Sequence, residues 1–125
     1  MLLNDFFTIK KNTEISDNEI FVEVSINPKH KIFEGHFPNN PVVPGVVSVQ
    51  MLNEILSQHL GFELINSNAK SIKFSAMINP LKNPKLNFKI KYSKLENASY
   101  KVNASIIFEE TTFLKFIGNF NKFAD

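Results

Sequence analysis

Residues 33–45 read Phe-Glu-Gly-His-Phe-Pro-Asn-Asn-Pro-Val-Val-Pro-Gly, and an apolar stretch follows directly. The prolines at 38, 41 and 44 exclude a regular helix or a central strand here and leave a stiff loop. His36 lies on this loop, and histidine is the side chain best suited to move protons near neutral pH. The helix predicted to follow has free N–H groups in its first turn, which stabilise negative charge. A base beside such a helix start indicates chemistry next to a carbonyl.

The segment from Pro44 or Gly45 to about Leu60 has the periodicity of a helix. Its apolar residues recur every three or four positions, at Val46, Val49, Leu52, Leu56 and Leu60. Pro44 suits the first helical position, and Gly61 suits a helix stop. The broad apolar coverage predicts a helix that is covered on most sides.

The rest of the chain predicts β-structure. Residues 20–26 alternate apolar and polar, which is typical of a half-buried strand. Residues 5–10 begin a strand or a helix, and residues 12–18 are polar and turn-like. Four further strands are expected after residue 68, at 72–77, 86–92, 99–108 and 112–123. Their short connections predict successive antiparallel neighbours.

Composition narrows the function classes. No linker or repeat interrupts the 125 residues, so we expect residues 1–125 to form a single domain. The absence of cysteine excludes disulfides and thiolate metal sites and fits a reducing compartment, so we expect a cytoplasmic protein. The N-terminus does not look like a signal peptide, and no apolar run is long enough for a membrane span. The net charge of +2 comes with scattered lysines, which argues against a nucleic-acid partner.

The three histidines do not form a metal-binding pattern. His30, His36 and His59 lack the spacing of known ligand sets, so we expect no metal and no other cofactor. Only His36 has a catalytic setting. His30 and His59 are expected to be ordinary surface residues.

Residues 35–46 contain the pattern Gly-His-Phe-Pro-x-x-Pro-Val-x-Pro-Gly-Val. This segment resembles the hotdog-fold 3-hydroxyacyl-(acyl-carrier-protein) dehydratases of the FabZ and FabA type. The order of elements agrees over essentially the whole chain, although the family's Pro-Gly-Asp turn is replaced by Asn-Pro-Lys at 83–85. The resemblance implies an α+β hotdog fold, in which an antiparallel sheet wraps one long central helix. It also implies at least a homodimer, with active sites at the subunit interface.

The resemblance assigns roles to several residues. His36 would remove a proton from C2 of a 3-hydroxyacyl thioester carried by acyl carrier protein, giving the trans-2-enoyl thioester. The Gly45 N–H would polarise the thioester carbonyl, with Val46 and Phe37 beside the substrate. Such charge stabilisation is needed because a proton next to a thioester is only weakly acidic. The expected pathway is fatty-acid or related polyene- or polyketide-type synthesis.

The chain departs from the family pattern at the position of the family's catalytic carboxylate. The family carboxylate falls fourteen residues after the histidine, where this chain has Gln50, and the family glutamine falls four residues later, where it has Glu54. These two positions share one helix face, one turn apart. Glu54 could act through water or through Gln50, or His36 could make both proton transfers while Gln50 binds the hydroxyl. Catalysis could also be lost, leaving a site that only binds acyl chains.

One alternative for the two helix residues and two alternatives for the function stay open. Gln50 and Glu54, with Asn53 and Ser57, could simply be the polar stripe of an amphipathic helix. The chain could be an acyl-thioester hydrolase, although such enzymes do not need the His36 loop. It could also be a non-catalytic module that binds acyl chains or carrier protein.

Overall fold

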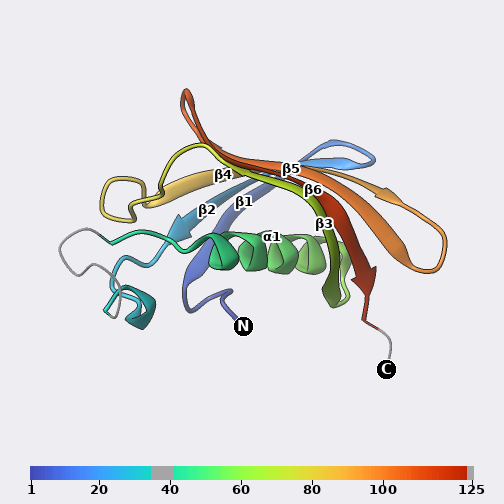
Figure 1. Ribbon diagram of the computed structural model, residues 1–125, viewed down its shortest axis with the longest axis horizontal. Coiled ribbons are helices and arrows are strands. Elements are labelled where there is room, and N and C mark those ends of the chain that lie inside the picture. The colour runs from blue at the N-terminus through green and yellow to red at the C-terminus, as the bar shows by residue number, and fades with distance from the viewer. Residues whose placement is uncertain (35–40, 124–125) are drawn as a thin grey trace.

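The computed structural model describes residues 1–34 and 41–123. A six-stranded antiparallel sheet curves around one long helix, which lies under its arch (Figure 1). The strands follow the order β1-β2-β4-β5-β6-β3 across the sheet. In chain order the elements are β1 (Phe7–Ser16), β2 (Glu19–Ile26), the 3-10 helix η1 (Lys31–Phe33), α1 (Gly45–Leu60), β3 (Leu64–Phe74), β4 (Lys85–Lys94), β5 (Ser99–Phe108) and β6 (Thr111–Lys122).

The predicted helix is confirmed, with one change at its start. Pro44 has an extended backbone, so it is the N-cap residue of α1 and the first helical residue is Gly45. Gly61 ends the helix in the left-handed conformation at φ 84°, where the lack of a Cβ removes the steric penalty. Met51 through Leu56 are all buried. The middle of the helix is therefore covered on most sides, as expected.

Two strand predictions are wrong at their ends. Residues 12–16 are not a turn, because β1 continues to Ser16 and its polar residues pair with β2. β3 begins at Leu64, well before the predicted start at residue 72. Both misassigned stretches are polar and largely exposed, so they lack the alternation that marks a half-buried strand.

The expected pairing of the last four strands is wrong for one neighbour. β4, β5 and β6 are successive neighbours, but β3 pairs with β6 and β4 pairs with β2. The connection between β3 and β4, residues 75–84, is too long for a tight hairpin. It crosses beside the segment before α1, where the Val43 N–H donates to the Ile78 carbonyl at 2.9 Å.

β3 is an exposed edge strand. Ten of its eleven residues are exposed, and Leu64 is the buried one. Ile65, Ile72 and Phe74 are large apolar residues on this edge. An edge strand with one unpaired side and exposed apolar side chains is typical of a protein–protein contact.

No helix within residues 1–34 and 41–123 combines the length and apolarity that a membrane crossing requires.

Gly118 allows β6 to pack closely against this edge strand. A Cβ at this position would lie 2.4 Å from the Asn68 carbonyl oxygen and 2.8 Å from Phe116 Cζ. We predict that Gly118→Ala lowers the free energy of unfolding by about 1–3 kcal/mol, because backbone must move to relieve the overlap. Urea denaturation measures this change. Gly61→Asn is the control, since space is open there and Asn tolerates the left-handed conformation; equal losses in the two variants would contradict the prediction.

Candidate active site

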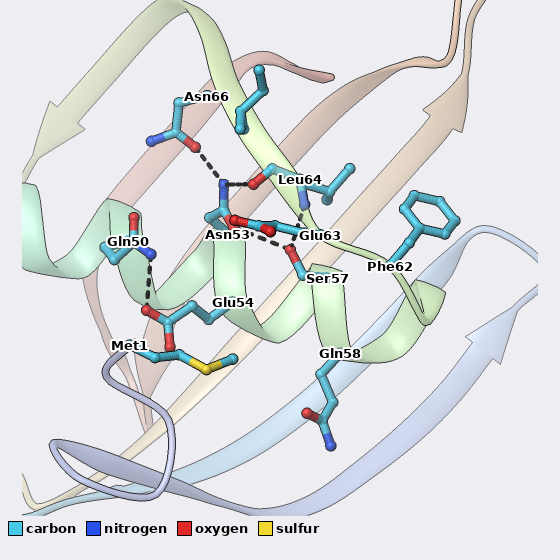
Figure 2. Close-up of a pocket in the computed structure, with 11 residues that line it drawn as sticks. Met1, Gln50, Asn53, Glu54, Ser57, Gln58, Phe62, Glu63, Leu64 and Asn66 are labelled. Atoms are coloured by element: carbon cyan, nitrogen blue, oxygen red, sulfur yellow. Dashed lines mark hydrogen bonds between the residues drawn. The ribbon is translucent and has the colours of Figure 1, made fainter. Parts of the chain in front are cut away.

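A cavity of about 590 Å³ lies between α1 and the start of β3 (Figure 2). Its helix wall includes Gln50, Asn53, Glu54 and Ser57. Helical spacing explains this grouping, because residues three and four apart share one face. The Gln50 side chain is exposed, whereas Glu54 is only 4% exposed. The cavity therefore has a polar wall with a buried carboxylate behind an accessible amide.

Glu54 accepts hydrogen bonds from three donor groups. The backbone N–H groups of Leu2 and Leu3 both reach its Oε1 at 2.8 Å, and the Leu2 N–H also reaches Oε2 at 3.0 Å. The Gln50 Nε2–H donates to Oε2 at 2.8 Å. Burying a carboxylate is costly unless it is hydrogen-bonded, and these donors meet that requirement. Glu54 thus joins the N-terminal segment to the cavity wall.

A second polar group joins α1 to β3. The Asn53 Nδ2 donates to the Leu64 carbonyl at 3.0 Å and to Asn66 Oδ1 at 2.7 Å. Ser57 Oγ donates to Asn53 Oδ1 at 3.1 Å and accepts from the Leu64 N–H at 3.1 Å. The amphipathic-stripe interpretation is therefore wrong for Asn53, because its buried side chain holds the edge strand in place.

We predict that Asn53→Asp destabilises the protein by about 1–3 kcal/mol, because the new carboxylate faces two acceptors in place of its lost donor. Thermal or urea denaturation of the purified variant measures the loss. Asn103→Asp, at an exposed position of β5, is the matched control and should cost little. Equal stability of the Asn53 and Asn103 variants would show that the buried amide is not needed.

The start of α1 opens onto a different cavity, of about 450 Å³, which Gly45, Ser48, Phe74 and Met77 help to line. A Cβ on Gly45 would lie 2.6 Å from Phe74 Cζ, so glycine permits this ring to pack on the helix start. Among the described residues, the N–H groups of Gly45 and Val46 donate no hydrogen bond. They are available to a negative charge, as the first amides of a helix generally are.

Within one chain, the predicted site residues that the structure describes thus lie near two different cavities. Gln50 and Glu54 share a helix face, as expected, and are in contact. Gly45 lies at the second cavity, and the Val46 side chain is 78% exposed at the helix start. His36 and Phe37 lie outside the described residues, so their roles stay predictions. Within the described ranges, no cluster of three His, Asp or Glu side chains could hold a metal ion.

His30 and His59 are not ordinary surface residues. His30 Nδ1 accepts from the Ile32 N–H at 3.1 Å and so caps η1, while its Nε2 contacts Asp5 Oδ2 at 2.9 Å. His59 contacts the Tyr92 hydroxyl at 3.1 Å. Burial raises the pKa of the Tyr92 phenol above its ordinary value. Sequence pattern missed the contacts with Asp5 and Tyr92 because each joins segments that are far apart in the chain.

The N-terminal segment is the main feature that the sequence did not reveal. Leu2 and Leu3 act on Glu54 through backbone N–H groups, which leave no side-chain signature. Asp5 contacts His30, and Phe6 packs against the His30 and Phe33 rings. The segment therefore contacts both the helix carboxylate and the elements that precede residue 35.

Residues 11–112 match the family model described as ApeI-like, ApeI dehydratase. The chain belongs to the ApeI-like dehydratase family. Among curated relatives, the 3-hydroxyacyl-(acyl-carrier-protein) dehydratase FabZ of Acinetobacter baumannii is 34% identical over 65 residues, which cover 52% of this chain and 44% of that protein. The FabZ of Syntrophobacter fumaroxidans is 23% identical over 113 residues, covering 84% and 76%. The chain thus spans less than half the length of the first relative.

Solved structures confirm the expected hotdog fold. The dehydratase heterocomplex ApeI:P from Xenorhabdus doucetiae superposes with a TM-score of 0.70 at 17% identity, covering 91% of this chain and 96% of that one. A hypothetical thioesterase with coenzyme A from Streptococcus pneumoniae superposes with a TM-score of 0.63 at 12% identity, covering 94% and 86%. Identities this low bear on the fold of this ApeI-like chain and not on its chemistry.

Proposed function

We propose that this chain dehydrates 3-hydroxyacyl thioesters on acyl carrier protein to trans-2-enoyl thioesters, in fatty-acid or related polyene- or polyketide-type synthesis. The observation that carries the proposal is the Gln50–Glu54 pair on the wall of a cavity in an ApeI-like dehydratase. By the resemblance to the FabZ and FabA type, this pair corresponds to the family's acid and amide positions, counted from the histidine of the Gly-His-Phe-Pro motif.

In the proposed reaction His36 removes the C2 proton, and the electron pair of that C–H bond forms the C2–C3 double bond. The C3–O bond breaks, and the leaving oxygen needs a proton to depart as water. The Gly45 N–H stabilises the charge that develops on the thioester oxygen. Gln50 hydrogen-bonds the hydroxyl but cannot supply a proton, because an amide is not an acid. His36 therefore returns the proton that it took from C2.

A second copy of the chain would complete the site. The cavity at Gln50 lies beside the start of β3, and the cavity at Gly45 lies beside its end, near Phe74. If two exposed β3 edges pair antiparallel about a two-fold axis, the start of one strand lies beside the end of the other. Each Gln50 cavity would then adjoin the partner's helix start. The exposed apolar residues on this edge support such a homodimer.

The first test is His36→Ala, assayed for enoyl formation from a 3-hydroxyacyl-carrier-protein substrate. Loss of the only proposed base should lower kcat by about 10²–10⁴-fold or more. His59→Gln is the matched control and should keep activity near that of the wild type, since His59 lies at the far end of α1. Release of free thiol without enoyl formation would instead identify a thioesterase, and carrier-protein binding without turnover would identify a binding module.

The second test restores the family order with the double variant Gln50→Glu/Glu54→Gln. A carboxyl group at position 50 can donate the proton that Gln50 cannot, and general acids contribute roughly 10²–10⁴-fold. We expect kcat for dehydration to rise at least about tenfold. Circular dichroism of the variant checks its folding. A folded variant with unchanged or lower kcat would contradict the idea that the missing acid at position 50 limits the rate.

A further inference from the structure

We propose that Glu54 is a positioning residue that holds the Gln50 amide with its carbonyl oxygen toward the cavity, so that the site selects a 3-hydroxyl group over a 3-oxo group. The inference rests on the proposed function and adds the basis of its substrate choice. It assigns Glu54 a task other than donating a proton to the substrate.

The contacts of Glu54 fit an ionised carboxylate. Both oxygens receive hydrogen bonds, from the Leu2 and Leu3 backbone and from the Gln50 amide. Each partner is a donor, and backbone N–H groups cannot exchange that role for acceptance. An ionised carboxylate is likewise only an acceptor. Glu54 is also buried, whereas Gln50 is exposed in front of it.

This carboxylate decides which way the Gln50 amide points. The reverse orientation would bring the Gln50 carbonyl oxygen to 2.8 Å from Glu54 Oε2, with two acceptors facing each other. The Nε2 group therefore faces Glu54. The carbonyl oxygen Oε1 points away from Glu54, as Figure 2 shows. Gln50 thus offers the cavity an acceptor.

An acceptor fixed in this way discriminates between oxidation states of C3. A 3-hydroxyl group has a proton to donate to Gln50 Oε1, whereas a 3-oxo group is itself only an acceptor. Two facing acceptors leave both groups unsatisfied after water is excluded, which is costly. We expect the wild-type protein to bind a 3-hydroxyacyl ligand about tenfold more tightly than the 3-oxo ligand of the same length.

The test uses acyl-pantetheine amides, which replace the thioester by an unreactive amide and carry a 3-hydroxyl or a 3-oxo group. Calorimetry gives the ratio of the two dissociation constants. In Glu54→Gln, the Leu2 and Leu3 N–H groups retain the new side-chain oxygen, so its NH₂ group faces Gln50. The Gln50 amide then turns over and presents NH₂ to the cavity. We expect the preference for the hydroxyl ligand to be lost or reversed.

The ratio of the two dissociation constants distinguishes a positioning role of Glu54 from a merely structural one. If Glu54 only supported the fold, Glu54→Gln would weaken both ligands equally and leave the ratio unchanged, which would overturn the inference. Glu110→Gln makes the same chemical change in the β5–β6 turn, far from the cavity, and should leave the wild-type ratio intact.

Gln50→Leu is the second variant, because the side chain that it replaces is exposed, and circular dichroism checks its folding. It should bring the ratio close to one. A preference that survives in Gln50→Leu would overturn the inference, as would a wild-type protein that binds both ligands equally or binds neither. Enoyl formation from the 3-hydroxyacyl thioester is measured in parallel. Turnover without discrimination refutes only the role of Glu54, whereas discrimination without turnover refutes only the dehydratase proposal.

Discussion

A buried carboxylate organises the candidate site. Glu54 forms no ion pair within the described residues, and it is satisfied by the backbone N–H groups of Leu2 and Leu3 and by the Gln50 amide. An unpartnered buried charge would destabilise the fold, so the N-terminal segment has to lie against α1. The same requirement fixes the Gln50 amide. One constraint therefore links chain folding, the cavity wall and the chemistry offered to a ligand.

The proposed exchange of acid and amide fits the local structure. Position 54 is buried beneath the N-terminal segment, and position 50 faces the cavity. A carboxylate at 54 is held by backbone donors, so it is well placed to orient its neighbour and poorly placed to reach a substrate. Gln50 takes the exposed position but supplies only hydrogen bonds. In the proposed reaction this arrangement places both proton transfers on His36.

The sequence predicted the parts of the fold in which side chains carry the information. The bounds of α1 and β5 and the alternation of β2 follow from apolar periodicity. The four-residue spacing of Gln50 and Glu54 predicted that they share one helix face, and their hydrogen bond confirms that placement. The length and pairing of β3 could not be predicted, because an edge strand is polar and exposed and its partner β6 lies far along the chain.

The contacts of Glu54 could not be predicted from the sequence for a different reason. Leu2 and Leu3 act through backbone N–H groups, which every residue except proline has, so no residue type marks them. The buried role of Asn53 was hidden in the same way, since one partner is the Leu64 carbonyl. Such contacts follow from where segments meet in space, and local patterns do not carry that information.

Neutron diffraction from crystals of the protein with the 3-hydroxyacyl-pantetheine amide would test the central claim most directly, because it locates the hydrogens on Gln50 and Glu54. The account predicts an unprotonated Glu54 carboxylate that receives the Gln50 NH₂ group, with Gln50 Oε1 accepting from the ligand's 3-hydroxyl. A proton on Glu54, or a Gln50 amide with its NH₂ group toward the ligand, would contradict it.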